Sequence, residues 1–517
     1  MKKIFTKAFW SEILDNKKYR MILASIILFI VLLIGFIVSV NFVKFRNYST
    51  TFYVREDVVG RIYKFSEFSK HLKGDVADSN IYEIQGTDNT VAIVKKDKID
   101  VYNTIDLIKD LKACGVKDTS QYELSKDVFT NITKLDSMNE VYDNVKNGNF
   151  EVGILSYKEA STLIRADNSD SIEISDAIVE KVPSLLLIGG THPNEPSGQL
   201  AATVVLENAK VKRGILYVIT ELNRSAYSYS QPQEGTTWYY HLETKNGEIR
   251  TFKFGSRATN TVDQWPTPDV YTHSSGQQLS SSEVRNINRA YPGNEEGTYT
   301  EQIAWVVTNF VNTKDVTMVI DLHEASPEYL TINQCVYHQD AQEVWSQMKI
   351  NGFRYYNSDL NKTQRLNMPG DVSPENMHGL THREVGDYTN AYVFLFETSN
   401  ASQGKIRGAF TEDLIKYSSP DKFYEALVKY DKEHGTSNIY GEPVEISERV
   451  ARHVLSFESV ITGFNQIKTT RTVDKTGRDN IGVGGEFVGE MILEEGSIPS
   501  YYDLVKYGVG YYLLDSK

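Results

Sequence analysis

Three segments of the sequence place polar side chains directly after short apolar runs. His192 and Glu195 belong to the first segment, His323 to the second and Glu397 to the third. In open α/β sheets, ligands bind beyond the carboxyl ends of the strands, so such a fold would bring the three segments together. Burying polar groups without partners is costly. A ligand shared by these side chains therefore explains their placement.

Together, these four residues have the types that a catalytic zinc site needs. His192, Glu195 and His323 offer two nitrogens and one carboxylate, which leaves a fourth position open. Glu397 would be the unligated carboxylate that acts as a base toward a water. A His-x-x-Glu spacing alone also occurs by chance, and a histidine beside a proline is often an ordinary surface or core residue. The spacing by itself leaves both interpretations open.

The elements that must position these residues begin at Pro183, where apolar runs alternate with helical segments. We expect strands at 184–188, 214–220, 316–322 and 391–396, and helices at 198–208 and 300–312. Pro196 occupies a favoured position in the first turn of the first helix. This alternation predicts an α/β/α sandwich with a mixed, largely parallel sheet. We assign residues 183–467 to this domain.

Four motifs in this region resemble those of a known family. Gly-Gly-Thr-His-Pro-Asn-Glu-Pro-Ser-Gly at 189–198 is followed by Asn-Arg-Ala-Tyr-Pro-Gly at 288–293, Asp-Leu-His at 321–323 and then Glu397. In order and separation these motifs resemble the M14-type zinc metallocarboxypeptidase superfamily. The Asn-Arg-x-Tyr-Pro-Gly form is most similar to the succinylglutamate desuccinylase/aspartoacylase branch. The resemblance covers roughly Pro183 to Asn400, under half of the chain.

This resemblance implies a zinc carboxypeptidase-like fold and one zinc ion per chain, held by His192, Glu195 and His323. It implies that Glu397 is the general base, which takes a proton from the attacking water and passes it to the leaving amine. Asp321 lies two residues before His323 and would point to the same side of a strand. It is therefore a candidate acceptor for the ring N–H of His323.

The resemblance also implies contacts with the substrate. Asn288 and Arg289 match the pair that grips a substrate carboxylate, for which the planar guanidinium is suited. Arg257 is our match for an earlier arginine that stabilises the oxyanion. Arg285 is the alternative, and its other expected role is a surface salt bridge with Glu283 or a neighbouring residue.

These matches predict a zinc metallohydrolase that cleaves an amide bond next to a substrate carboxylate. The expected substrate is a peptide or an N-acyl amino acid with a free carboxylate. One alternative is a deacylase or esterase of small N-acyl amino acids. Another is a non-catalytic surface protein that binds carboxylates, which would be marked by loss of a ligand or of the base. All four positions are filled here.

A long apolar run near the N-terminus predicts a membrane anchor. Residues 21–43 are uncharged and mostly Ile, Leu, Val or Phe. At about 1.5 Å per residue, such a helix crosses a hydrocarbon core of about 30 Å. Basic residues are concentrated before it, which predicts a single-pass cell-membrane protein with residues 1–20 in the cytoplasm and the catalytic domain outside. The alternative is a cleaved signal peptide, but the run is unusually long and no clear cleavage site follows.

The remaining segments carry no sign of chemistry. Residues 44–182 mix short strand-like and helical runs and predict a small α+β stalk domain outside the membrane. Residues 468–517 are rich in Gly and aromatic residues and predict a small β unit. The only two cysteines are Cys114 and Cys335, and we expect two separate buried thiols rather than a disulfide.

Length and charge narrow the function further. A chain of 517 residues exceeds what one hydrophobic core usually serves, so we expect more than one globular unit. The formal net charge is −13. Binding phosphates needs a concentrated basic surface, so we expect no nucleic-acid partner.

Overall fold

The structure is a computed structural model that describes residues 25, 53, 55, 58–229, 239–329, 332–403, 407, 410–418, 422–435, 444–467 and 489–515. The chain forms two compact units, Met1–Thr51 and Phe52–Lys517. Apart from residue 25, the predicted tail 1–20 and membrane span 21–43 lie outside the described residues. Within the described ranges, no helix combines the length and apolar character that a membrane crossing requires.

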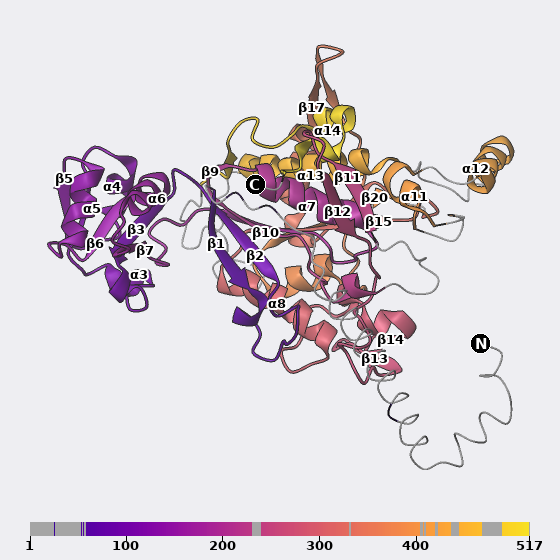
Figure 1. Ribbon diagram of the computed structural model, residues 1–517, viewed down its shortest axis with the longest axis horizontal. Helices are drawn as coiled ribbons and strands as arrows, with labels where there is room; N and C mark the ends of the chain where they lie inside the picture. The colour runs from indigo at the N-terminus through magenta and orange to yellow at the C-terminus, as the bar shows by residue number, and fades with distance from the viewer. Residues whose placement is uncertain are drawn as a thin grey trace. The chain divides into compact units, whose positions relative to one another are not determined.

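A mixed eight-stranded sheet carries the predicted site residues (Figure 1). Its strands are β1 (Val59–Lys64), β2 (Asn80–Gln85), β8 (Ser184–Ile188), β10 (Ile215–Ile219), β15 (Met318–Ala325), β16 (Gln334–Tyr337), β19 (Gly370–Val372) and β20 (Tyr392–Ser399). They are ordered β1-β2-β10-β8-β15-β20-β16-β19. The central strands β10, β8, β15 and β20 are parallel, whereas β2 and β16 flank them in antiparallel pairing. The predicted largely parallel α/β sheet is confirmed.

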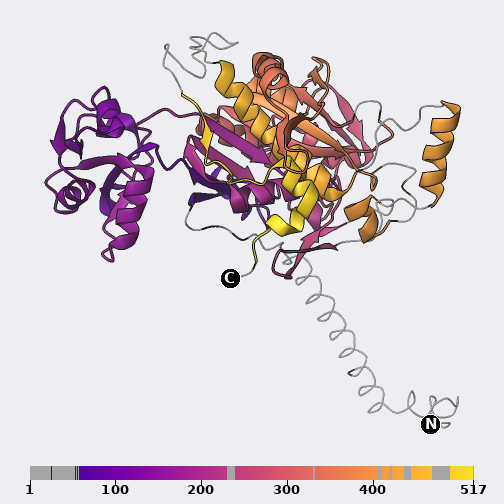
Figure 2. The ribbon, with the colours of Figure 1, turned by 90° about the horizontal axis from the view of Figure 1, so that it is seen from above.

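Helices cover both faces of this sheet. They are α7 (Pro196–Asn208), α8 (Tyr299–Thr313), α9 (Gln342–Asn351) and α13 (Ile446–Ile467). Leu185 and Leu187 of β8 pack in one apolar cluster with α7, α9 and α13, and Figure 2 shows α13 lying across this face. Leu186 and Ile188 face the opposite side and pack with α8. Because β8 is buried on both faces, its sequence is a continuous apolar run rather than an alternating one.

A separate five-stranded sheet follows β2 in the chain. Its strands are β3 (Thr90–Lys95), β4 (Ala113–Val116), β5 (Ile132–Leu135), β6 (Val152–Ser156) and β7 (Ile172–Ile174), in the order β5-β4-β6-β3-β7. Its helices are α3 (Ile105–Ile108), α4 (Ser120–Ser125), α5 (Met138–Lys146) and α6 (Tyr157–Ala166). It has apolar clusters of its own. This part of the chain is an α+β unit.

The predicted boundaries 44–182 of the stalk domain differ from this arrangement. Strands β1 and β2 belong to the large sheet, because β2 pairs antiparallel with β10 from Gln85 opposite Ile215 to Tyr82 opposite Val218. The unit with its own sheet begins only at β3. An apolar run shows that a strand forms, but its backbone partner lies far away in the sequence and leaves no local signal.

In the described ranges, four strand pairs and four further α-helices lie outside these two sheets. The pairs are β11 (Tyr239–Glu243) with β12 (Ile249–Lys253), β13 (Val270–Thr272) with β14 (Gln278–Ser280), β17 (Arg354–Asn357) with β18 (Lys362–Arg365), and β9 (Val211–Arg213) with β21 (Ile492–Leu493). The helices are α10 (Gly386–Tyr388), α11 (Glu412–Tyr417), α12 (Lys422–His434) and α14 (Tyr501–Tyr507). The pair β13–β14 lies in the segment between Arg257 and Asn288.

The C-terminal segment differs from the predicted β unit. Residues 468–488 lie outside the described ranges, and 489–515 contribute the two-residue strand β21 and the helix α14. Tyr501 and Leu504 of α14 are buried in the same apolar cluster as α13. The aromatic residues that suggested strands instead pack this segment onto the large domain.

Cys114 and Cys335 are both buried and unpaired, as predicted. Cys114 lies in β4 and Cys335 in β16, which belong to different sheets. Burial raises the pKa of Cys114 to about 12 and that of Cys335 well above its ordinary value. Both thiols are therefore inert packing groups.

The half-buried carboxyl of Glu458 on α13 should make stability depend on pH. Burial raises its pKa from 4.5 to about 7. A raised carboxyl pKa contributes stability that is present below about pH 4.5 and is lost as the pH rises through about 7. Between pH 4.5 and pH 8, the free energy of unfolding of Glu458→Gln should therefore rise by about 1–3 kcal/mol relative to that of the wild type. Urea denaturation at both pH values, with the exposed Glu296→Gln as control, tests this, and a pH-independent difference would contradict it.

Candidate metal centre

The predicted site residues lie at the carboxyl ends of three neighbouring strands. His192 and Glu195 occupy the loop between β8 and α7, His323 lies in β15 and Glu397 in β20. His323 and Glu397 are directly opposite each other in the parallel pair β15–β20. Residues opposite each other in such a pair point to the same face of the sheet. The fold therefore brings all four residues to one edge, on the face that α8 covers.

Two glycines shape the loop that carries the first two residues. Gly190 has φ +71°, a conformation that residues with a side chain rarely adopt, and it turns the chain after β8. Gly198 lies in the first turn of α7, and a Cβ added there would lie 2.5 Å from the carbonyl oxygen of Leu322. Because α7 approaches β15 this closely, Glu195 at the start of the helix reaches His323.

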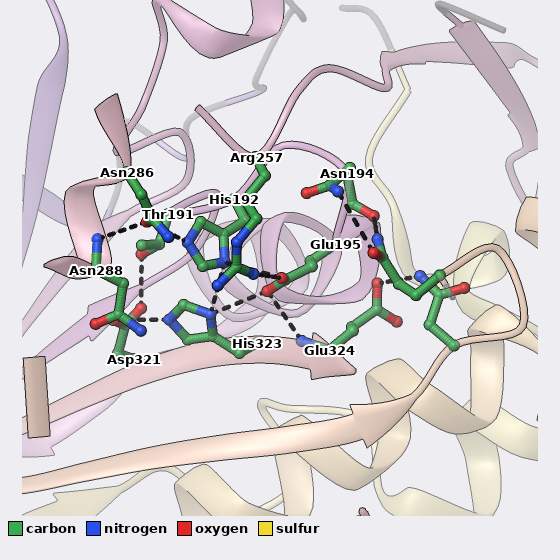
Figure 3. Close-up of polar contacts among 12 residues, drawn as sticks. Thr191, His192, Asn194, Glu195, Arg257, Asn286, Asn288, Asp321, His323 and Glu324 are labelled. Carbon is green, nitrogen blue, oxygen red and sulfur yellow. Dashed lines mark hydrogen bonds and ion pairs between the residues drawn. The ribbon is translucent and has the colours of Figure 1, made fainter. Parts of the chain in front are cut away.

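The side chains of three potential metal ligands converge at this point (Figure 3). His192 Nδ1 lies 2.8 Å from Glu195 Oε1, His323 Nδ1 lies 2.9 Å from Glu195 Oε2, and the two ring nitrogens are 3.2 Å apart. All three side chains are buried. Ligands at about 2.0–2.2 Å from a tetrahedral zinc ion are about 3.3 Å from one another. The donor set and its spacing therefore fit a divalent metal ion.

Outer contacts direct the two imidazoles toward this point. His323 Nε2 lies 2.9 Å from Asp321 Oδ2, and Asp321 also accepts from Thr191 Oγ1 at 2.7 Å and from Thr381 Oγ1 at 2.5 Å. His192 Nε2 lies 2.8 Å from Asn286 Oδ1. In each ring Nε2 faces an oxygen outside the cluster, so a proton on Nε2 would leave the lone pair of Nδ1 for a metal ion. The predicted contact between Asp321 and His323 is present.

Sequence reasoning did not single out Asn286. Its Nδ2 donates to Glu283 Oε2 at 3.0 Å, and its Oδ1 also accepts from the backbone N–H of Asn288 at 2.9 Å. These contacts keep Oδ1 directed at His192. The only signal in the sequence was its position two residues before the Asn288–Arg289 motif.

The charges around the converging atoms are strongly coupled. Burial lowers the pKa of His323, but the Asp321 and Glu195 carboxylates outweigh it and raise that pKa well above its ordinary value. Burial likewise raises the pKa of Glu195, but His192 and His323 hold it below its usual range. A proton thus competes with a metal ion for His323 Nδ1, and binding of the ion would release it.

Glu397 is an acid next to this group rather than a member of it. Burial and the negative charge of Glu195 raise its pKa from 4.5 to about 8, against the opposing effect of His323 and Arg257. Its Oε2 is buried and has no hydrogen-bond partner in the described part of the chain. A carboxyl group in this state can hold a proton close to the converging ligand atoms.

The structure separates the two candidate arginines. Arg257 Nη1 lies 3.3 Å from Glu195 Oε1, so its guanidinium borders the ligand atoms. Arg285 is buried and donates to Tyr229 Oη at 2.7 Å and to the backbone carbonyl of Thr259. Arg285 therefore holds neighbouring loops together, and among the described residues it forms no salt bridge with Glu283 or a neighbour. Of the two, Arg257 is the one that the fold brings to the site.

Asn288 and Arg289 lie at the rim of the same site. Asn288 is buried, and its Oδ1 accepts from the backbone N–H of Thr381 at 2.8 Å. Arg289 donates from Nη1 to the Asn288 carbonyl at 2.7 Å, and its Nε lies 3.2 Å from Glu283 Oε2. Both residues are held by backbone and charged partners, which fixes the position of the guanidinium.

A buried ion pair supports the ligand loop from the other face of the sheet. Glu324 accepts from the backbone N–H of Ser197 at 3.2 Å and from Asn400 Nδ2 at 3.0 Å, and its own backbone N–H donates to Glu195 Oε2 at 3.1 Å. Its Oε1 lies 2.5 Å from Arg449 Nη1, and both side chains are fully buried. The side chain of Glu324 thus accepts a hydrogen bond from a backbone N–H in the first turn of α7, and its backbone N–H positions the Glu195 carboxylate.

A second group of possible metal ligands already has hydrogen-bond partners within the protein. It consists of His273, His378 and Glu384. His273 Nε2 lies 2.7 Å from the Tyr291 carbonyl oxygen, and its Nδ1 accepts from the backbone N–H of Ser275 at 3.1 Å. His378 Nδ1 lies 2.8 Å from Glu384 Oε1. Both ring nitrogens of His273 already have hydrogen-bond partners, so this group offers no ready metal site. It connects the β13–β14 hairpin to the segment around Glu384.

Comparisons with known proteins found distant structural matches. No protein-family model matches the sequence, and no curated protein matches it. A succinylglutamate desuccinylase/aspartoacylase from Rhodobacter sphaeroides is 16% identical with a TM-score of 0.26, over 51% of this chain and 58% of that one. A succinylglutamate desuccinylase from a Silicibacter species is 15% identical with a TM-score of 0.26, over 51% and 60%.

A different kind of structure matches a shorter stretch. An amino acid ABC transporter substrate-binding protein from Streptococcus pneumoniae, bound to L-arginine, is 22% identical with a TM-score of 0.17, over 18% of this chain and 39% of that one. The chain thus spans between about two fifths and three fifths of the length of these solved structures. Identities and TM-scores this low do not assign the chain to a family.

Removing the carboxylate that orients His323 should weaken metal binding. Without Asp321, nothing fixes the tautomer that directs Nδ1 toward the other ligand atoms, so Asp321→Ala should lower the affinity for Zn²⁺ by about 10–100-fold. Competition with a chromophoric chelator measures this affinity. Glu296→Gln, an exposed charge change, should leave it unaltered, and an equal affinity for Asp321→Ala would refute the role of Asp321.

Breaking the buried ion pair should destabilise the domain. Arg449→Met leaves the Glu324 carboxylate buried without its cation and should lower the free energy of unfolding by about 3–5 kcal/mol. The double variant Arg449→Met/Glu324→Gln removes both charges and should recover part of this loss. Urea denaturation measures all three proteins, and a single variant as stable as the wild type would contradict the prediction.

Proposed function

We propose that this protein is a membrane-anchored, zinc-dependent hydrolase that cleaves an amide bond next to a substrate carboxylate. The observation that supports it most is the convergence of His192, Glu195 and His323 from separate chain segments, with the unligated carboxyl of Glu397 beside them. A binding protein would not need an acid in that position.

In this proposal each residue has one task. His192, Glu195 and His323 would hold zinc, which when bound would polarise the scissile carbonyl and lower the pKa of a water toward neutrality. Glu397 would take the proton of the attacking water on its carboxylate and deliver it to the leaving nitrogen. Burial raises the pKa of this carboxyl, and the charge of a bound divalent cation would favour its carboxylate form, which accepts the proton.

Two arginines would bind the negative charges of the reaction. Arg257 borders the ligand atoms and would stabilise the charge that develops on the carbonyl oxygen. Arg289 would bind the substrate carboxylate. Asn288 uses its Oδ1 for Thr381, so its Nδ2 is the group that would donate to the substrate. The substrate is accordingly a peptide or an N-acyl amino acid with a carboxylate near the scissile bond.

The proposed location follows from the sequence at the N-terminus. The apolar run 21–43 would anchor the chain in the lipid bilayer, and the basic residues before it would keep residues 1–20 in the cytoplasm. The hydrolase domain would then meet its substrates outside the cytoplasm. Extracellular peptides and cell-wall peptides are the substrates accessible there.

Metal content and turnover of the full-length protein test this proposal together. The purified protein should contain about one zinc per chain and hydrolyse members of a panel of peptides, muropeptides and N-acyl amino acids. Glu397→Gln should lower kcat by at least about 10²-fold without loss of zinc, because the proton acceptor is gone while the ligands remain. Glu296→Gln serves as the control for loss of one carboxylate.

The other outcomes separate the alternatives. Zinc without turnover on any member of the panel would favour a non-catalytic carboxylate-binding protein. Turnover confined to small N-acyl amino acids or esters would favour a deacylase. Absence of zinc from protein purified without chelators would remove the basis of the proposal.

A further inference from the structure

Glu283 lies between the two arginines that the proposed function assigns to the substrate. Its Oε1 is 3.2 Å from Arg257 Nε, and its Oε2 is 3.2 Å from Arg289 Nε. The three side chains are 32%, 33% and 23% exposed, respectively, so they line the open side of the site rather than its core. One carboxylate of the protein thus bridges both guanidinium groups.

This carboxylate is kept charged by its surroundings. Burial raises the pKa of Glu283, but Arg257 and Arg289 outweigh that effect and lower it below its ordinary value. Burial and the like charge of Arg257 lower the pKa of Arg289, which shows that the two cations interact. Without Glu283 between them, the two guanidinium groups would repel each other across the site.

The same carboxylate is connected to the metal ligands. Asn286 donates from Nδ2 to Glu283 Oε2 at 3.0 Å, and Asn286 Oδ1 lies 2.8 Å from His192 Nε2. Glu283 therefore fixes the orientation of the Asn286 amide as well as the two arginines. Through Asn286, Glu283 thus connects the two arginines to His192.

Glu283 also determines which hydrogen-bond donors remain for a ligand. Arg289 uses Nε for Glu283 and one Nη1 donor for the Asn288 carbonyl. Its Nη2 makes no hydrogen bond or ion pair with the described residues. The Nη1–Nη2 edge of this one guanidinium is thus the side that can accept a single carboxylate in a bidentate manner.

We propose that Glu283 makes the site selective for substrates with one carboxylate beside the scissile bond and excludes substrates with two. Two guanidinium charges and one fixed carboxylate leave a single net positive charge, which one substrate carboxylate neutralises. A second carboxylate placed near these arginines would meet the negative charge of Glu283, and such a like-charge encounter rejects a ligand effectively. This inference rests on the proposed function of Arg257 and Arg289.

Binding of two matched probes tests the role of Glu283 without relying on turnover. N-acetyl-L-alanine carries one carboxylate and N-succinyl-L-alanine carries two. Calorimetric titration at low salt uses the full-length, zinc-loaded protein with Glu397→Gln, so that neither probe is consumed. We expect the first probe to bind at least about tenfold more tightly than the second, and Glu283→Gln to abolish or reverse this preference.

Two further variants keep the outcome interpretable. Glu283→Asp preserves the charge and should retain the preference even if both probes bind more weakly, whereas Glu296→Gln should leave both affinities unchanged. The same preference with and without the Glu283 charge would overturn the inference, as would failure of both probes to bind the zinc-loaded protein. Neither result bears on zinc content or on turnover of the panel, so a failure of the proposed function is detected separately.

Discussion

The close packing of α7 against β15 is the constraint on which the metal centre depends. Gly198 lets the helix approach so near that a side chain there would collide with the Leu322 carbonyl. This approach carries Glu195 to a point between two imidazoles, where its two oxygens contact His192 and His323. If the helix were displaced outward, these buried polar groups would lose one another as partners, which is energetically unfavourable. Apolar packing thus creates the geometry that the ligands require.

Buried charged side chains next to the candidate ligands stabilise this arrangement. Glu324 binds Arg449 on α13 and also accepts from the first turn of α7, so one carboxylate connects three elements of the sandwich. Asp321 fixes His323 and is itself held by two hydroxyl groups. Removing one partner from such a network is unfavourable because the other remains buried without compensation. The order of the site is therefore a property of the whole domain rather than of its loops.

The two sides of the site differ in charge. The ligand atoms and Glu397 occupy the strand ends, and Arg257 and Arg289 lie on the open side. Asn286 connects them, because it contacts His192 with one end of its amide and Glu283 with the other. A substrate carboxylate bound on the open side would thus be placed at a set distance from the metal ligands, which is the kind of orientation that accelerates a reaction.

The sequence alone determined the central strands and singled out His192, Glu195, His323 and Glu397 at their ends. A strand buried on both faces must be a continuous apolar run, so the residues that end it, such as His323 and Glu397, stand out. Only the tertiary structure showed that Arg257 contacts Glu195, placed β2 in the large sheet, and revealed Glu283 and Arg449 as partners of neighbouring charged residues. The physical reason is that periodicity reports local conformation and burial. Packing across the whole fold determines which distant residue pairs with a buried charge and which strand pairs with an unpaired strand edge.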